Sequence, residues 1–292
     1  MIIEQSDSLA DIVADPRLQA SLREIVLTSP NIDQLSGFYE SALGYVGERT
    51  ADAWTGHLST RRLSIRDGAA NAIDRAIFTV PDENQLRALE LRLQAADVPH
   101  EKAGGLGLRG DALHFADPDG NRLTFGLADD DAAQERGSIE LTARLQHVVY
   151  ASDRVAMLLA FYQGIVGFAP SDFVFDEAGD LTSVFLRCGD EHHSLAVFRA
   201  RRRRLDHICY DVADWSQIRD WADRFAARHI SLRWGPGRHG PGNNLFLFIN
   251  DPDGNWLEFS AELERVENPR APGRWVHEER TLNSWGSAFL RS

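Results

Sequence analysis

Two histidines and a glutamate in the second half of the chain have the residue types of a metal site. His147, His207 and Glu258 each lie next to apolar neighbours in segments rich in β-forming residues. Two imidazoles and one carboxylate can hold one face of an octahedral ion and leave the opposite face open to small molecules. A buried glutamate also needs a counter-charge, which a metal ion provides. We therefore interpret these three residues as candidate metal ligands.

The first half of the chain carries different residues at the corresponding positions. An overlay of the two halves aligns the three candidate ligands with Glu24, Arg75 and Thr124. The match is close but not free of gaps, because Arg75 and Thr124 lie 49 positions apart and the equivalent pair 51. These three residues cannot all ligate a metal. The overlay thus predicts a metal site in the second half alone.

An internal repeat underlies this overlay. The intervals from Glu24 to Tyr39 and from His147 to Tyr162 both span 15 positions. Each interval begins in a short apolar segment and continues into a helical pattern, in which we expect the tyrosine to belong to the core. Both halves later contain the sequence Asp-Pro-Asp-Gly-Asn, which suits a tight connection between two strands.

The repeat predicts an α+β fold with two domains, each built from two paired β-α-β-β-β units. Asp82 and Asp214 are suitable N-caps for the helices of the second and fourth units. The later helix should place four apolar residues on one face: Ile218, Trp221, Ala222 and Phe225. The predicted limits are 1–19 for an N-terminal extension, 20–128 for a domain without metal, 129–142 for a linker, 143–262 for the metal-bearing catalytic domain and 263–292 for a C-terminal tail or lid.

Composition and charge narrow the class of protein further. The chain has 292 residues and a formal charge of −13, which disfavours nucleic acid as a partner. No apolar stretch approaches the ~18 residues that cross a bilayer, and the first residues do not resemble a signal peptide. Cys188 and Cys209 fit small buried side chains in a reducing compartment. We expect a cytoplasmic homo-oligomer without a membrane partner.

Two further histidines are candidates for acid–base chemistry. His193 and His239 both precede predicted strands of the second half, so both can face the same cavity as the candidate ligands. A histidine with a pKa near neutrality can take a proton from a phenol and return it later. The remaining histidines have no comparable context and are interpreted as surface or core residues: His57, His100, His114, His229 and His277.

These features together resemble the two-domain type I extradiol ring-cleaving dioxygenases of the vicinal oxygen chelate superfamily, which shares the glyoxalase/bleomycin resistance/dioxygenase fold. The resemblance covers roughly residues 20–265. It rests on the four repeated units, on the ligand triad in the second half, and on two motifs, GRHGPG at 237–242 and DPDGNWLE at 251–258.

The resemblance implies an activity and a set of roles. His147, His207 and Glu258 would bind Fe(II), or Mn(II) in some members, and O₂ would be a co-substrate. His193 matches the acid–base histidine of the family, and His239 matches the histidine that contacts the bound catecholate oxygen. The reaction would be extradiol (meta) cleavage of a small catechol-type aromatic diol in the catabolism of aromatic compounds.

One position departs from the family pattern. Many members carry a tyrosine nine residues after the histidine of the Gly-Arg-His motif, and this chain has Phe248 there. A phenyl ring cannot donate the hydrogen bond of that tyrosine. We expect Phe248, Phe246 and the tail residue Trp285 to line an aromatic substrate pocket.

Other functions of the same superfamily stay open at this point. A glyoxalase-like lyase or isomerase, or a hydroquinone dioxygenase, would also be metal-dependent. A non-enzymatic protein that sequesters an aromatic compound, as bleomycin-resistance proteins do, would need no triad. The substrate, proximal or distal cleavage, the choice between Fe(II) and Mn(II), and the order of the oligomer are not decided by the sequence.

Overall fold

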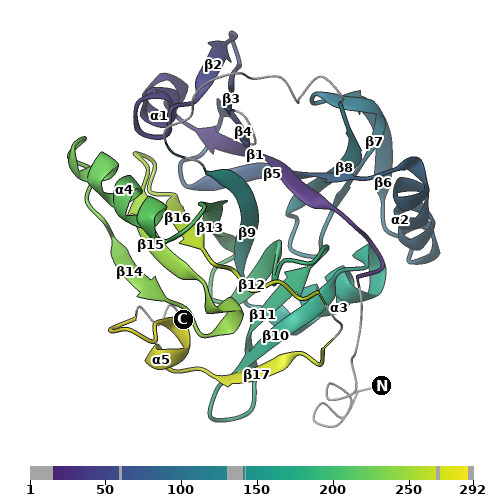
Figure 1. Ribbon diagram of the computed structural model, residues 1–292. Coiled ribbons are helices and arrows are strands. Elements are labelled where there is room, and N and C mark those ends of the chain that lie inside the picture. Colours follow the sequence, from purple (N-terminus) through teal and green to yellow (C-terminus); the bar gives the residue numbers. More distant parts are fainter. Residues whose placement is uncertain (1–15, 59–60, 130–140, 142, 268–269, 289–292) are drawn as a thin grey trace.

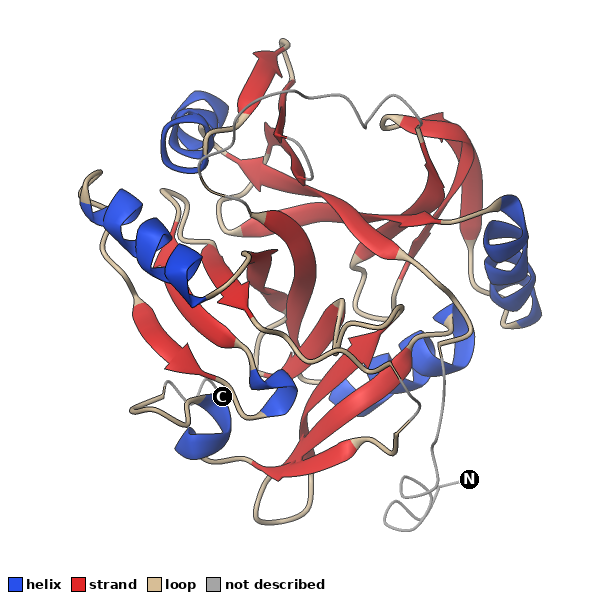
Figure 2. Cartoon of the chain, viewed as in Figure 1, coloured by secondary structure: helices blue, strands red, loops and turns tan. Residues whose placement is uncertain are grey.

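The computed structural model describes residues 16–58, 61–129, 141, 143–267 and 270–288. Two curved β-sheets dominate it, and short helices flank them (Figure 1, Figure 2). The α+β class and the four β-α-β-β-β units predicted from the repeat are confirmed by the order of the elements. Most of the predicted N-terminal extension (1–19) and linker (129–142) lies outside the described residues, and the predicted domain limits stay a proposal.

The first sheet has eight strands, in the order β2-β3-β4-β1-β5-β8-β7-β6. Its elements are β1 (Ser21–Ser29), α1 (Ile32–Phe38), η1 (Tyr39–Leu43), β2 (Val46–Arg49), β3 (Ala53–Leu58), β4 (Arg61–Asp67), β5 (Ala72–Val80), α2 (Glu83–Ala95), β6 (His100–Gly105), β7 (Leu108–Ala116) and β8 (Arg122–Ala128). In each unit the first strand pairs in parallel with the last strand, β1 with β4 and β5 with β8.

The second sheet repeats this plan and adds a strand from the tail. Its order is β14-β15-β16-β13-β9-β12-β11-β10-β17. The elements are β9 (Arg144–Ser152), α3 (Val155–Phe161), η3 (Tyr162–Val166), β10 (Ala169–Phe175), β11 (Leu181–Arg187), β12 (Leu195–Arg199), β13 (Arg204–Asp211), α4 (Trp215–Ala226), β14 (Trp234–Arg238), η4 (Pro241–Asn243), β15 (Leu245–Asn250), β16 (Trp256–Ala261), β17 (Gly273–Val276) and α5 (Glu279–Leu282). Strand β17 pairs in parallel with β10 at the edge of the sheet.

The two longer helices begin and pack as their sequences predict. The carboxylate of Asp82 accepts a hydrogen bond from the backbone N–H of Gln85 at 2.9 Å. The carboxylate of Asp214 accepts one from the backbone N–H of Gln217 at 3.1 Å. In α4 the side chains of Ile218, Trp221 and Phe225 are buried against the sheet. These contacts fix α4 on the face of the sheet opposite to the candidate ligands, because strand side chains alternate between the two faces.

Reciprocal hydrogen bonds join the two halves of the molecule. The hydroxyl of Tyr39 donates to Asp251 Oδ2 at 3.0 Å, and the hydroxyl of Tyr162 donates to Asp117 Oδ2 at 2.8 Å. Each aspartate opens one of the two Asp-Pro-Asp-Gly-Asn turns, so the first unit contacts the fourth and the third contacts the second. Both tyrosines are fully buried, which confirms their predicted place in the core.

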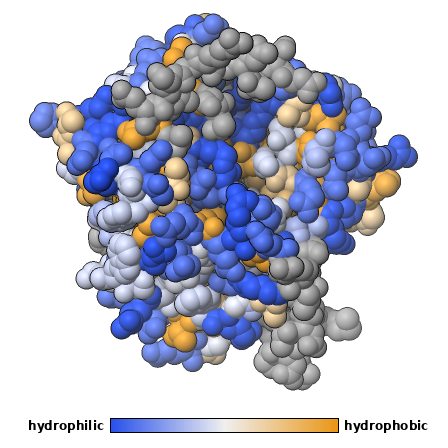
Figure 3. Space-filling view, viewed as in Figure 1, coloured by the Kyte–Doolittle hydropathy of each residue, from blue (hydrophilic) through white to orange (hydrophobic). Residues whose placement is uncertain are grey.

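The surface in Figure 3 is mostly hydrophilic, with hydrophobic side chains in small scattered groups. This agrees with the acidic composition of the chain. Among the helices of the described residues, none combines the length and the apolar character needed to cross a lipid bilayer.

Candidate metal centre

Three neighbouring strands of the second sheet present the candidate ligands on one face. His147 lies on β9, His207 on β13 and Glu258 on β16, and β13 runs between the other two. Cys209, two residues after His207, pairs with His147 on one side and with Glu258 on the other. The register therefore brings side chains that are far apart in sequence to one place on the sheet.

The nitrogen atoms of both histidines point at the same carboxylate oxygen. His147 Nε2 lies 3.3 Å and His207 Nε2 lies 3.2 Å from Glu258 Oε2. All three residues are at most 5% exposed. Metal–ligand bonds of about 2.1 Å place neighbouring ligand atoms of an octahedron about 3 Å apart. The donor types and their spacing thus fit a divalent ion bound by these three residues.

The charges of the site favour cation binding as well. Burial alone would raise the pKa of the Glu258 carboxyl, but contacts with the imidazoles of His147, His207 and His239 outweigh burial and hold this pKa well below its usual range. Burial lowers the pKa of His147 despite its contact with Glu258. A negative carboxylate and a neutral imidazole are the protonation states that a metal ion requires.

Neighbouring polar side chains orient two of the candidate ligands, His207 and Glu258. His207 Nδ1 lies 2.8 Å from Asp206 Oδ1, so this nitrogen carries the proton and leaves Nε2 to face Glu258. Burial opposes a positive charge on His207, but its bonds to Asp206 and Glu258 outweigh burial and raise the pKa of this imidazole. Asn244 donates to the other oxygen of Glu258 at 3.2 Å.

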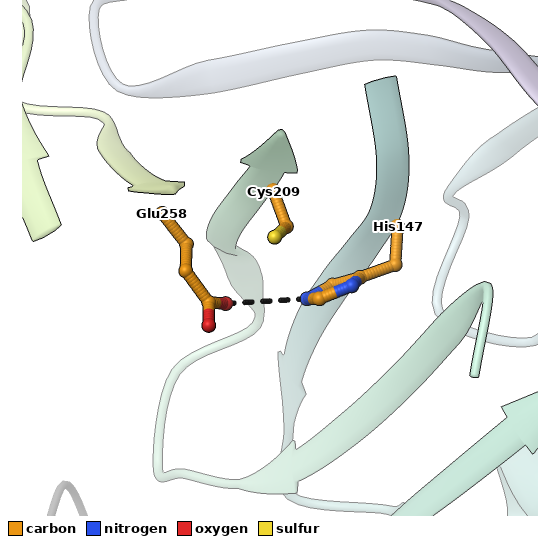
Figure 4. Close-up of side chains that lie close together, drawn as sticks. All are labelled: His147, Cys209 and Glu258. Atoms are coloured by element: carbon orange, nitrogen blue, oxygen red, sulfur yellow. Dashed lines mark hydrogen bonds and ion pairs between the residues drawn. The ribbon is translucent and has the colours of Figure 1, made fainter. Parts of the chain in front are cut away.

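Cys209 is a fourth side chain within reach of a metal. One ligand atom each from His147, Cys209 and Glu258 lie within 4.8 Å of one another, and Figure 4 shows the thiol between the imidazole and the carboxylate. Burial raises the pKa of the Cys209 thiol well above its usual value, and its sulfur donates to Gln146 Oε1 at 3.7 Å. A protonated thiol is a poor ligand. We therefore favour His207 over Cys209 as the third ligand.

A cavity opens beside the ligands and is lined by residues from both units of the second half. The lining includes His147, Val149, Thr182, Ser183, Phe185, His193, Phe198, Arg199, Asp206, His207, Trp234, His239, Pro241, Asn244, Phe248, Glu258, His277, Thr281 and Leu282. Aromatic and aliphatic side chains form much of its wall, and the candidate ligands supply part of its polar lining. This distribution suits a flat apolar ring that carries polar atoms on one edge.

Both candidate acid–base histidines reach this cavity. The ring centre of His193 lies 4.1 Å from that of His147, and burial together with the neighbouring His147 and His192 holds the pKa of His193 well below its usual value. The ring of His239 stacks on Phe246 with centroids 3.9 Å apart. Its Nδ1 lies 2.5 Å from the carbonyl oxygen of Leu282, and its Nε2 lies 3.4 Å from Glu258 Oε1.

Of the three residues predicted to line a substrate pocket, one lines this cavity. Phe248 lines the cavity, with its ring edge-on to His207 at 5.3 Å and stacked on Trp234 at 5.3 Å. Phe246 does not line it, because its ring lies beneath the imidazole of His239. Trp285 does not line it either, since this side chain is 54% exposed and packs against Trp215. Neither residue is among those that line this cavity, and the assignment of Phe246 and Trp285 to the substrate pocket stays a prediction.

The tail contributes other residues to the cavity than those predicted. His277, interpreted from the sequence as a surface or core residue, lines it together with Thr281 and Leu282. The sequence interpretation also missed Asp206 and Asn244, which contact the ligands directly. Strand alternation could have identified Cys209, because it lies two residues after His207 and therefore on the same face.

Comparisons with known proteins agree with this geometry. Residues 144–259 match the Glyoxalase/Bleomycin resistance protein/Dioxygenase superfamily. Metapyrocatechase 2 of Cupriavidus necator is 31% identical over 147 residues, which cover 50% of this chain and 45% of that relative. This chain therefore spans less than half of that relative in the match.

Solved structures share the fold over nearly the whole chain. Homoprotocatechuate 2,3-dioxygenase from Arthrobacter globiformis has a TM-score of 0.80 at 22% identity and covers 96% of this chain and 93% of its own. The Mn(II)-bound glyoxalase from Novosphingobium aromaticivorans has a TM-score of 0.77 at 23% identity, covering 91% and 90%. The second half of this chain is a domain of the vicinal oxygen chelate superfamily, and its named homologues include extradiol ring-cleaving dioxygenases.

Proposed function

We propose that this protein is a non-haem Fe(II)-dependent dioxygenase that opens a catechol-type aromatic diol by extradiol cleavage with O₂. The observation that carries the proposal is the convergence of His147, His207 and Glu258 beside a cavity with an apolar wall. Two imidazoles and one carboxylate leave positions open for exchangeable ligands. Its place in aromatic catabolism follows from this activity.

The three converging residues would hold the metal. When bound there, Fe(II) would bring an aromatic diol and O₂ together. Its positive charge would stabilise negative charge on the diol oxygens, which makes the hydroxyl protons easier to remove. Mn(II) is the alternative metal, because it prefers the same ligand types. Asp206 and Asn244 keep His207 and Glu258 in the orientation that binding needs.

His193 and His239 have different tasks in this proposal. Burial and the neighbouring imidazoles lower the pKa of His193, which favours the neutral ring that can accept a proton from a diol hydroxyl and return it to oxygen later. His239 uses Nδ1–H for the Leu282 carbonyl, so it can donate from Nε2 only in its cationic form. A cationic His239 would stabilise negative charge that develops on oxygen.

The cavity wall holds the ring of the substrate and excludes water. Phe248 and Trp234 stack on each other. Phe248 offers no hydroxyl group at the position where many members of the resembled family have a tyrosine. Arg199 lines the cavity but is paired with Asp176 at 2.7 Å. The substrate we propose is therefore a small uncharged aromatic diol, which packs against these rings.

A glyoxalase-like lyase or isomerase is the second candidate function. It is favoured by the fold shared with the Mn(II)-bound glyoxalase of Novosphingobium aromaticivorans. Such a reaction moves protons and consumes no O₂, so oxygen uptake separates the two functions. A cytoplasmic homo-oligomer stays a prediction.

The test is oxygen uptake by protein reconstituted with Fe(II) under anaerobic conditions. We expect uptake with at least one compound from a panel of catechols and hydroquinones, together with a coloured ring-opened product. Glu258→Ala protein treated in the same way is the blank. A protein that holds one metal ion per chain and consumes no O₂ with any diol would contradict the proposed function.

A further inference from the structure

A row of three buried side chains runs from the cavity toward the C-terminal tail. His193 lines the cavity, His192 lies behind it, and Asp172 on β10 lies behind His192. Their exposed fractions are 4%, 0% and 2%. His193 is a candidate acid–base group, whereas His192 and Asp172 have no part in the site described so far.

Short contacts connect the three residues. Nδ1 of His193 lies 3.0 Å from Nδ1 of His192, and Nε2 of His192 lies 3.1 Å from Asp172 Oδ2. The second contact is an ion-pair distance without the alignment of a formed hydrogen bond. Glu264 Oε2 is 4.0 Å from the same nitrogen, and Arg270 pairs with both Asp172 and Glu264.

The tail holds Asp172 in place. Its Oδ1 accepts from the backbone N–H of Gly273 at 2.9 Å and from Arg270 at 3.1 Å, and its Oδ2 accepts from the indole of Trp275 at 2.7 Å. Burial alone would raise the pKa of this carboxyl, but His192, Trp275 and Arg270 outweigh burial and lower it. Asp172 is therefore a fixed negative charge in a buried place.

The nitrogen–nitrogen contact restricts where protons can be. Two facing ring nitrogens share one proton, since two N–H groups would clash and two lone pairs would repel. Asp172 favours a proton on Nε2 of His192. Neutral His192 then accepts at Nδ1, so His193 carries its proton on Nδ1 and keeps Nε2 free as a base.

We propose that His192 and Asp172 are positioning residues that set the tautomer of His193. The N–H at Nδ1 of His193 donates to Nδ1 of His192, and Asp172 holds the remaining proton of His192 on Nε2.

The first test is nuclear magnetic resonance of the imidazole nitrogens in the metal-free protein. We expect a single tautomer for His193, protonated at Nδ1, and one for His192, protonated at Nε2. In His192→Phe protein we expect His193 to become a mixture of both tautomers. His229→Asn, at an exposed turn, is the matched control and should leave both signals unchanged. An unchanged single tautomer of His193 in His192→Phe protein would overturn the proposal.

The second test uses turnover and rests on the proposed function. We expect His192→Phe and Asp172→Asn to lower kcat by about tenfold or more and to leave KM for the diol within about twofold. Asp172→Asn leaves every contact of His193 intact, so it keeps the test decisive if His192→Phe does not fold. An unchanged kcat in Asp172→Asn would overturn the positioning role of Asp172. Absence of oxygen uptake in wild-type protein would contradict the dioxygenase alone, because the tautomers are measured without it.

Discussion

The two sheets place different side chains at equivalent registers. In the second sheet Cys209 pairs with His147 and with Glu258, and in the first sheet Ile77 pairs with Glu24 and with Thr124. The strand pairing therefore confirms the overlay of the two halves. The inward positions differ most, whereas the turns and the helix tyrosines are the same in both.

The first half uses its inward positions for internal contacts. The hydroxyl of Ser64 donates to Glu24 Oε1 at 2.5 Å, Thr124 Oγ1 lies 2.9 Å from His114 Nδ1, and Arg75 is paired with Asp74 at 2.8 Å. Within the described residues, the carboxylate and histidine groups that converge tightly enough for a metal lie in the second half. A few inward residues thus decide the chemistry, and the opposite face of each sheet maintains the fold.

Removal of a candidate ligand should give the largest difference between the halves. We expect Glu258→Ala and His147→Ala to lose metal binding and turnover, because two donors hold a divalent ion too weakly. Metal content after dialysis measures the effect. Glu24→Ala is the matched control at the equivalent register and should retain one metal ion per chain. Full metal content in Glu258→Ala protein would defeat the ligand assignment.

Loss of the acid–base group should separate chemistry from metal binding. We expect His193→Phe to lower kcat by roughly 10²- to 10⁴-fold while metal content stays unchanged, because His193 contacts the ligands without being one. Steady-state oxygen uptake and metal analysis on the same sample measure both quantities. His114→Phe, in the first half, should change neither. A His193→Phe enzyme with wild-type kcat would remove this residue from the mechanism.

The turn aspartates should make stability depend on pH. Burial outweighs the bonds from Asn255 and Tyr39 and raises the pKa of Asp251 to about 6, and burial raises the pKa of Asp117 in the equivalent turn as well. The folded chain then binds this proton more tightly than the unfolded chain. Its contribution to stability is complete below about pH 4 and is lost as the pH rises through about 6.

Replacement of Asp251 should remove that dependence. Between pH 4 and 7 we expect the unfolding free energy of wild-type protein to fall by up to about 3 kcal/mol relative to Asp251→Asn. Urea denaturation of the metal-free proteins at a series of pH values measures the difference. Parallel stability curves for the two proteins would contradict the shift.

The tyrosines that cross between the halves should give the smallest effect. We expect Tyr39→Phe and Tyr162→Phe each to lower the unfolding free energy by about 1–2 kcal/mol, because each leaves a buried carboxylate with one bond fewer. Tyr150→Phe is the control, since its buried hydroxyl has no hydrogen-bond partner among the residues that the structure describes. Urea denaturation would contradict this account if Tyr39→Phe cost no more than Tyr150→Phe.

Much of the fold could be predicted because the two halves of the sequence repeat the same pattern of elements. The equal intervals from Glu24 to Tyr39 and from His147 to Tyr162 located the units, and the overlay then selected His207 and Glu258. The tail has no second copy, so nothing in the sequence placed His277 in the cavity or Trp285 outside it. Phe246 and Phe248 alternate onto the same face of β15, and only the stacking of His239 on Phe246 separates their roles.

The central claim is that this chain binds one catalytic metal, and binds it in the second half. Anomalous diffraction at the iron edge from crystals of the Fe(II)-loaded protein tests this claim without relying on activity. We predict one anomalous peak per chain, within bonding distance of His147 Nε2, His207 Nε2 and a carboxylate oxygen of Glu258. A peak in the first half, or one bonded to Cys209 in place of His207, would contradict it.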